Sequence, residues 1–173
     1  DALLYCNARS KAYGLDTCYS YSSKTMSGDT CKKLESLVYN SSKISFCLPQ
    51  LSEWKTAYFA GGSSSQNYYW GNDTADIATI NQYAWSIYNC KVNGNKTTHS
   101  VARKKPNNWG LYDMSGNSFE WCWDFVGSDG HYAIGGDYYW GADDLRPNKN
   151  NWTYGYLSLS AAGFRVILHV PKK

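Results

Sequence analysis

The spacing of apolar residues predicts two helices. Residues 1–11 carry apolar side chains every three to four positions, with Asp1 as the N-cap and Gly14 as the stop. Residues 50–60 follow directly after Pro49, a residue type that is favoured at helix starts. The side chains that share one face of this second helix belong to Leu51, Trp54, Ala57 and Tyr58. Each helix therefore has an apolar face to bury.

Alternating apolar and polar residues predict short strands. This pattern covers residues 17–23, 43–47 and 164–170, and residues 27–29 mark a turn. Residues 66–105 form one long, irregular and polar segment, and a loop of that length is usually functional or held by ions or disulfides. These elements predict an α+β fold in which loops outweigh the sheet.

Composition narrows the class of protein. The 173 residues include 16 Tyr, 8 Trp and 5 Phe, which is too much burial potential for a disordered chain. The net charge of +3 is too weak and too evenly spread for a nucleic-acid-binding surface. No apolar run approaches the roughly 20 residues of a membrane span. We therefore expect a globular domain with no nucleic-acid partner and no membrane insertion.

The six cysteines favour an oxidising compartment. They form no CxxC pair and no Cys/His cluster at zinc spacing, and the three histidines match no metal or catalytic template. An even cysteine count in a chain rich in Ser, Asn and Tyr favours an extracellular or cell-surface location. Cys18 and Cys31 flank a polar loop and form the predicted disulfide. Cys122, between two tryptophans, is predicted to be a buried free thiol.

Five motifs, in order, match one known pattern. Residues 48–54 read LPQLSEW, residues 69–72 read YWGN, residues 105–117 read KPNNWGLYDMSGN and are followed by FEW, residues 135–136 read GG, and residues 163–166 read GFRV. Together they resemble the formylglycine-generating enzyme (sulfatase-modifying factor) superfamily. The resemblance covers residues 1–168 and implies an α+β, C-type lectin-like fold of the formylglycine-generating enzyme type, with little regular secondary structure and long loops.

The same resemblance predicts the domain organisation. We interpret residues 1–173 as a single domain of this type that lacks the family's N-terminal strand and first helix. A fragment of a longer domain would explain this, and so would another chain that completes the N-terminal part of the fold. The sequence leaves both explanations open.

The family's enzymes use two copper-binding cysteines that lie between the GG and GFR motifs. Residues 135–162 of this chain contain no Cys, so the soft thiolate pair that copper(I) prefers is missing. Another branch of the superfamily carries a His-rich iron site, and this chain has no such cluster. We therefore expect no copper, no iron and no enzymatic activity.

The resemblance also implies a structural calcium ion. In the family the GLYDMxGN loop holds calcium through an Asp side chain, main-chain carbonyls and the Glu of the WEW motif. Transferred to this sequence, the ligands are Asp113, Gly116, Ser118 and Glu120. Closely spaced oxygen donors suit the six to eight ligands of calcium. The alternative is a plain turn in which Asp113 bonds nearby backbone N–H groups.

The segment that forms the family's active-site surface has the composition of a binding surface. Its aromatic, small polar and acidic residues resemble a paratope, although some of the aromatic rings are expected to pack beneath the loop. The predicted ligand-binding residues are Asp137, Tyr138, Tyr139, Trp140, Asp143, Asp144, Asn148, Trp152 and Tyr154. This composition also resembles that of variable proteins of diversity-generating retroelements, which randomise this segment, mainly to residues such as Asn, Asp and Tyr. Trp140, Lys149 and Trp152 would need another origin.

These observations predict a non-catalytic domain that binds a protein or a glycan on a calcium-stabilised scaffold. One alternative is a metal-dependent oxidase related to formylglycine-generating enzyme. The other is a structural subunit of a surface assembly, to which a neighbouring chain supplies the missing elements.

Overall fold

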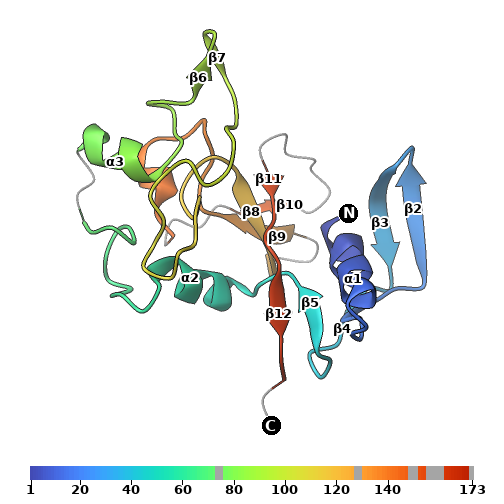
Figure 1. Ribbon diagram of the computed structural model, residues 1–173. Coiled ribbons are helices and arrows are strands. Elements are labelled where there is room, and N and C mark those ends of the chain that lie inside the picture. Colours follow the sequence, from blue (N-terminus) through green and yellow to red (C-terminus); the bar gives the residue numbers. More distant parts are fainter. Residues whose placement is uncertain (73–75, 127–129, 148–151, 155–161, 172–173) are drawn as a thin grey trace. The chain divides into compact units, whose positions relative to one another are not determined.

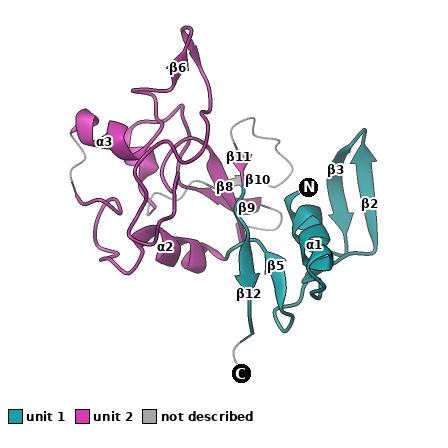
Figure 2. Cartoon of the chain, in the orientation of Figure 1, with its two compact units in different colours: residues 1–49, 164–173 teal, residues 50–163 magenta. Residues whose placement is uncertain are grey.

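The computed structural model divides the chain into two compact units, coloured separately in Figure 2. Unit 1 comprises residues 1–49 and 164–173, and unit 2 comprises residues 50–163. The structure describes residues 1–72, 76–126, 130–147, 152–154 and 162–171, and for residues 152–154 it describes the backbone alone. Within these ranges, every helix is too short or too polar to cross a membrane.

The described part of unit 1 contains one helix and six short strands (Figure 1). These elements are α1 (Ala2–Ala12), β1 (Tyr19–Ser20), β2 (Ser23–Ser27), β3 (Thr30–Glu35), β4 (Val38–Tyr39), β5 (Ser45–Cys47) and β12 (Ile167–His169). The strands form three antiparallel pairs, β1 with β4, β2 with β3, and β5 with β12. The third pair joins two segments that lie near opposite ends of the sequence.

One hydroxyl group connects α1 to β5. The Oγ of Ser10 donates a 2.9 Å hydrogen bond to the carbonyl of Cys6 and accepts a 2.8 Å hydrogen bond from the N–H of Phe46. The predicted N-cap, Asp1, directly precedes the helix, but its carboxylate accepts from the N–H of Cys31 on β3 and does not cap α1. The N-terminal helix is thus held by contacts with the strands that follow it.

Unit 2 contains the larger sheet. Its described elements are α2 (Leu51–Phe59), α3 (Ile77–Tyr83), β6 (Lys91–Val92), β7 (Asn95–Lys96), β8 (Phe119–Val126), β9 (Gly130–Ile134), a 3-10 turn (Ala142–Leu145), β10 (Trp152–Tyr154) and β11 (Ala162–Gly163). Four strands form a sheet in the order β10-β9-β8-β11, in which only β11 runs parallel to its neighbour. The strands β6 and β7 form a separate hairpin.

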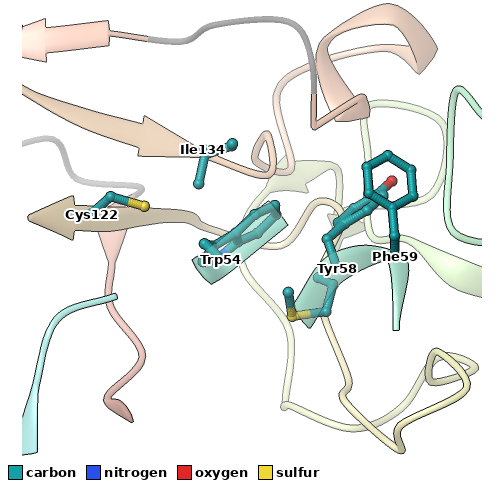
Figure 3. Packing of buried hydrophobic residues seen from close by; sticks show 6 residues of the cluster. Trp54, Tyr58, Phe59, Cys122 and Ile134 are labelled. Carbon is teal, nitrogen blue, oxygen red and sulfur yellow. The ribbon is translucent and has the colours of Figure 1, made fainter. Parts of the chain in front are cut away.

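The core of unit 2 lies between α2 and the sheet. It consists of Trp54, Tyr58, Phe59, Met114, Cys122 and Ile134, and Figure 3 shows the Trp54 indole at its centre. At the start of α2, the Oε2 of Glu53 accepts a 2.8 Å hydrogen bond from the backbone N–H of Gln50, the residue just before the helix. The predicted face of α2 is the one that packs on the sheet.

The predicted helices and the strands around β5 and β12 are present, with boundaries that differ by a few residues. The prediction of an irregular segment over residues 66–105 is wrong in part, because this segment contains α3 and the β6–β7 hairpin. Asp76 caps α3 by accepting from the N–H groups of Ala78 and Thr79. The hairpin turns at Asn93-Gly94, a pair of residue types that favours a two-residue hairpin loop. The α+β fold with long loops is confirmed.

Candidate ligand-binding face

The predicted ligand-binding segment starts at a tight turn after β9. Gly136 has a φ of +73°, and a side chain there would place its Cβ 2.8 Å from the carbonyl oxygen of Asp144. Only glycine adopts this conformation and allows this approach without strain. The turn carries the chain from the sheet directly into residues 137–140.

Asp137 holds the next turn together. Its Oδ1 accepts a 2.6 Å hydrogen bond from the N–H of Tyr139, and its backbone carbonyl accepts from the N–H of Trp140. The residue is only 5% exposed, and burial raises the pKa of its carboxyl group, against the opposing effect of the Tyr139 hydrogen bond. The carboxylate of Asp137 therefore supports the turn that presents the two aromatic residues.

Tyr139 and Trp140 present their rings at the surface, being 51% and 47% exposed. The carbonyl of Trp140 accepts a 3.2 Å hydrogen bond from the N–H of Ile87, and the Tyr88 hydroxyl lies 3.5 Å from the N–H of Ala142. Residues 87–88 thus lie beside residues 139–142. Ile87 and Tyr88 are themselves exposed, by 38% and 43%.

The β6–β7 hairpin adds a cation to this surface. The ammonium of Lys96 lies 4.6 Å from the centroid of the Tyr139 ring, a cation–π contact. Tyr138 packs on Tyr139 with their ring centroids 5.0 Å apart. We call the surface formed by Ile87, Tyr88, Lys96, Tyr139 and Trp140 the aromatic face.

The 3-10 turn anchors one side of the aromatic face. The Tyr68 hydroxyl donates a 2.6 Å hydrogen bond to the carbonyl of Ala142, and Leu145 is fully buried. Asp143 extends to the surface and forms an ion pair with Arg146 at 2.6 Å. Asp144 is half-buried on the same turn. Both predicted aspartates therefore lie on a short, well-packed segment next to the aromatic rings.

The other predicted ligand-binding residues are only partly covered by the structure. Asn148 lies outside the described residues. The backbone of Trp152 and Tyr154 lies in β10, opposite Tyr132 and Gly130 of β9, and their side chains are outside the description. The structure thus brings residues 137–144 together and leaves the contribution of β10 as a prediction.

The sequence analysis did not identify the three residues of the aromatic face that come from the segment 86–96. Ile87, Tyr88 and Lys96 lie in the segment that was predicted to be irregular. The available signal was the Asn93-Gly94 pair, which predicts a hairpin and hence an ordered support for Lys96.

At the predicted calcium site, Asp113 has a backbone partner and a nearby cation. Its Oδ2 accepts a 2.7 Å hydrogen bond from the N–H of Ala102, whereas its Oδ1 is buried without a hydrogen-bond partner among the described residues. Burial lowers the pKa of the Lys104 ammonium, and the Asp113 carboxylate acts in the opposite direction. Asp113 therefore has one carboxylate oxygen available to a metal ion, but the positive charge of the nearby Lys104 ammonium would repel that ion.

The other three predicted calcium ligands lie on the approach to β8 and at its start. The carbonyl of Gly116 accepts a 2.8 Å hydrogen bond from the N–H of Ser118. The Oε2 of Glu120 accepts a 2.7 Å hydrogen bond from the indole N–H of Trp54. The two carboxylates of the set thus have different protein partners, and calcium binding by these four residues stays a prediction.

The two cysteines of unit 2 are buried. Cys90 and Cys122 have no exposed surface, and Cys122 packs in the core beside Trp54. Burial raises the pKa of the Cys122 thiol, with a further rise from the carboxylates of Asp124 and Glu120. A protonated, enclosed thiol is a poor nucleophile and a poor metal ligand. Cys122 is therefore the buried free thiol that its neighbours in the sequence predict.

Both cysteines of the predicted Cys18–Cys31 disulfide are free thiols in the structure, and the pairing stays a prediction. Cys18 is buried, and its Sγ lies 3.4 Å from the carbonyl of Phe46. Cys31 lies on the hairpin strand β3, where its Sγ contacts the carbonyl of Lys33. The side chain of Cys18 is enclosed within the unit, whereas that of Cys31 remains on the hairpin.

Comparisons with known proteins find one matching family model and two kinds of relative. The family model described as "Sulfatase-modifying factor enzyme 1-like domain" matches residues 1–170. "Chaperone protein LppX" of Paenibacillus barcinonensis is 32% identical over 143 residues, which are 72% of this chain and 49% of that protein. A formylglycine-generating enzyme of Thermomonospora curvata is 33% identical over 88 residues, which are 49% of this chain and 29% of the enzyme. The chain thus spans half or less of the length of these relatives.

Solved structures show the same fold. Treponema denticola variable protein 1 matches with a TM-score of 0.74 at 25% identity, over 98% of this chain and 68% of that one. The crystal structure of CarF matches with a TM-score of 0.72 at 26% identity, over 98% of this chain and 65% of that one. The similarity to PvdO from Pseudomonas aeruginosa, with a TM-score of 0.63 at 19% identity, concerns the fold alone.

Proposed function

Because the chain belongs to the family of sulfatase-modifying factor enzyme 1-like domains, we propose that it uses the scaffold of this family for ligand binding without catalysis. One observation carries the proposal. The segment in which the resemblance places the copper-binding cysteines contains none, and it presents Tyr139 and Trp140 at the surface instead. Exposed aromatic rings on a rigid support are typical anchors of binding surfaces.

The support of the aromatic face fits this role. Its rings lie on a turn held by the Asp137 carboxylate, beside a hairpin and a 3-10 turn whose Leu145 is buried. A surface that is ordered before binding loses little conformational entropy when the ligand arrives. The exposed Ile87, whose N–H bonds to the Trp140 carbonyl, adds apolar area next to the rings.

We propose a protein as the first ligand class and a glycan as the second. An apolar aliphatic side chain beside exposed aromatic rings suits contact with a protein surface. One relative points the same way by name, because it is a chaperone protein. A glycan could stack on the same rings, and a binding experiment separates the two classes. For a domain of this kind we propose an extracellular or cell-surface location.

The test compares two Trp→Ala substitutions, one on the aromatic face and one elsewhere on the surface. Trp140→Ala removes a ring of the aromatic face, and Trp109→Ala removes a tryptophan that is 56% exposed on the loop beside Gly61. The fluorescently labelled chain is applied to a glycan array and to a phage-displayed peptide library. We expect Trp140→Ala to lower binding at least tenfold and Trp109→Ala to leave it unchanged. Equal binding by both variants would overturn the proposal.

The calcium ion of the scaffold is part of the same proposal and has its own test. The available Oδ1 of Asp113 supports it, and the hydrogen bond from Trp54 to Glu120 limits it. We expect the melting temperature to fall when calcium is replaced by a chelator, and Asp113→Asn to abolish that difference. The same purified protein is analysed for copper and iron, since either metal at one per chain would favour the oxidase alternative.

A further inference from the structure

Three thiol groups lie together inside unit 1. Cys6 on α1, Cys18 just before β1 and Cys47 on β5 are all buried, with at most 1% of their surface exposed. The Sγ of Cys18 lies 3.4 Å from the carbonyl of Phe46, the residue before Cys47. The Cys47 side chain is also near enough to lower the pKa of the Cys18 thiol. Residues that are distant in the sequence thus bring these two side chains together.

The surroundings give the two sulfurs different roles. The hydrogen bond from the Cys47 thiol lowers the pKa of Cys18 to about 7, although burial acts against it, and Ser45 contributes in the same direction. The pKa of Cys47 is raised, first because its thiol is the donor in this bond and then because it is buried. Ionisation is thus easier at Cys18 than at Cys47, which makes Cys18 the nucleophile of the pair.

The third thiol is set apart. Burial raises the pKa of Cys6 to about 12, so Cys6 stays protonated and unreactive. The Tyr39 hydroxyl lies 3.8 Å from the Sγ of Cys47 and marks the other side of the pair. Of the three cysteines, Cys18 and Cys47 are therefore the two that we expect to react with each other.

We propose that Cys18 and Cys47 form a disulfide when the protein is exposed to a small-molecule disulfide such as oxidised glutathione. The Cys18 thiolate attacks one sulfur of the oxidant and releases one thiolate, which leaves a mixed disulfide. Cys47 then loses its proton, attacks the Cys18 sulfur and releases the second thiolate. The protein gives up two electrons and two protons, and the oxidant becomes two thiols. Because both sulfurs are buried, the exchange takes place during folding or a transient opening of unit 1.

The bond would tie the start of β1 to β5 and so close a loop of roughly 30 residues that contains the β2–β3 hairpin. A cross-link over a loop of this length stabilises chiefly by restricting the unfolded chain. It would also fasten the strand that pairs with β12. Oxidation would therefore stabilise unit 1 without changing its contacts.

The experiment uses the full chain, refolded in a mixture of oxidised and reduced glutathione, alkylated and digested without reduction. Mass spectrometry is expected to find a peptide pair joined through Cys18 and Cys47. The melting temperature of this sample is expected to lie about 10 °C above that of the reduced sample. Cys47→Ser should remove the cross-link and the difference, and Cys31→Ser should keep both.

The mapping of the wild-type protein decides the proposal even if a variant fails to fold. A cross-link between Cys18 and Cys31, or between Cys6 and Cys18, would overturn it. Complete alkylation of Cys18 and Cys47 after oxidative refolding and denaturation would overturn it as well, because the two sulfurs would then have stayed reduced.

Discussion

The indole Nε1 of Trp54 donates a 2.7 Å hydrogen bond to the Oε2 of Glu120, and this bond joins α2 to β8 at the edge of the unit 2 core. A second bond runs between the same two elements, from the N–H of Leu51 to the carboxylate of Asp124. Two carboxylates of one strand therefore fix the position of one helix. Glu120 has this structural role whether or not it also binds calcium.

Substitution of Glu120 separates the hydrogen bond from the charge. Glu120→Gln keeps an oxygen that can accept from Trp54, whereas Glu120→Ala leaves a partly buried N–H without a partner. We expect Glu120→Ala to lower the free energy of unfolding by about 2 kcal/mol and Glu120→Gln to lower it by less than about 1 kcal/mol. Urea titration in the presence of chelator measures both. Equal losses would show that the hydrogen bond from Trp54 contributes little.

Much of the fold was predictable because it depends on local patterns. The α2 helix has a strong start signal at Pro49 and an apolar face, and both are visible within a dozen residues. The β2–β3 hairpin gives no such signal, since β2 is exposed along its whole length and so carries no alternation of buried and exposed positions. Its turn over residues 27–29 was predictable, whereas the strands on either side were not.

The aromatic face was predictable only in part, because it depends on contacts between distant parts of the sequence. Its segment at residues 137–144 follows from the motif resemblance. Its partner residues depend on a contact between Tyr88 and Ala142, which are 54 positions apart. The cysteine pairing shows the same limit. Cys31 is nearer to Cys18 in the sequence than Cys47 is, but the cysteine that affects the pKa of the Cys18 thiol most comes from β5.

A close backbone approach makes Gly116 hard to replace. Its φ is +73°, and a Cβ would lie 2.1 Å from the carbonyl oxygen of Trp85, which also accepts the N–H of Asn117. Gly110 has a similar φ of +77° but open space around the Cβ position. We expect Gly116→Ala to cost more than about 3 kcal/mol and Gly110→Ala about 1 kcal/mol. Unfolding curves of the two variants give the comparison, and equal losses would mean that the Trp85 carbonyl moves away freely.

One buried carboxamide joins the GLYDM loop to α2. The Nδ2 of Asn107 donates to the carbonyls of Ala57 and Tyr58, at 2.7 Å and 3.1 Å. Its Oδ1 accepts from the N–H groups of Trp109 and Leu111, both at 3.0 Å. The side chain thus satisfies backbone groups on both segments.

Removal of this carboxamide should be costly. Asn107→Ala leaves four backbone groups without that partner, and we expect a loss of about 3 kcal/mol in the free energy of unfolding. The neighbouring Asn108 is exposed, so Asn108→Ala should change it by less than about 0.5 kcal/mol. Thermal and urea unfolding test both variants. A small effect at Asn107 would indicate that water replaces the carboxamide.

Asp137 should make the stability of the ligand-binding segment depend on pH. Burial raises the pKa of its carboxyl group above the ordinary value of 3.8, with a further rise from Asp144, so the folded state favours the protonated form. A raised pKa contributes stability below pH 3.8, and this contribution is lost as the pH rises through the folded-state pKa. At neutral pH the burial of the ionised carboxylate therefore costs stability, which the hydrogen bond from Tyr139 offsets only in part.

The variant Asp137→Asn keeps an oxygen for the N–H of Tyr139 but cannot ionise. Its melting temperature, relative to the wild type, should therefore increase from pH 3.5 to pH 7 and be equal or higher at pH 7, by the linkage of proton binding to folding. The control is Asp143→Asn, which removes a largely exposed carboxylate whose ion pair with Arg146 contributes little. Melting curves across this pH range measure both variants. If the relative stability of Asp137→Asn instead decreased with pH, the charged carboxylate would be the form that the turn stabilises, and the hydrogen bond from Tyr139 would outweigh burial.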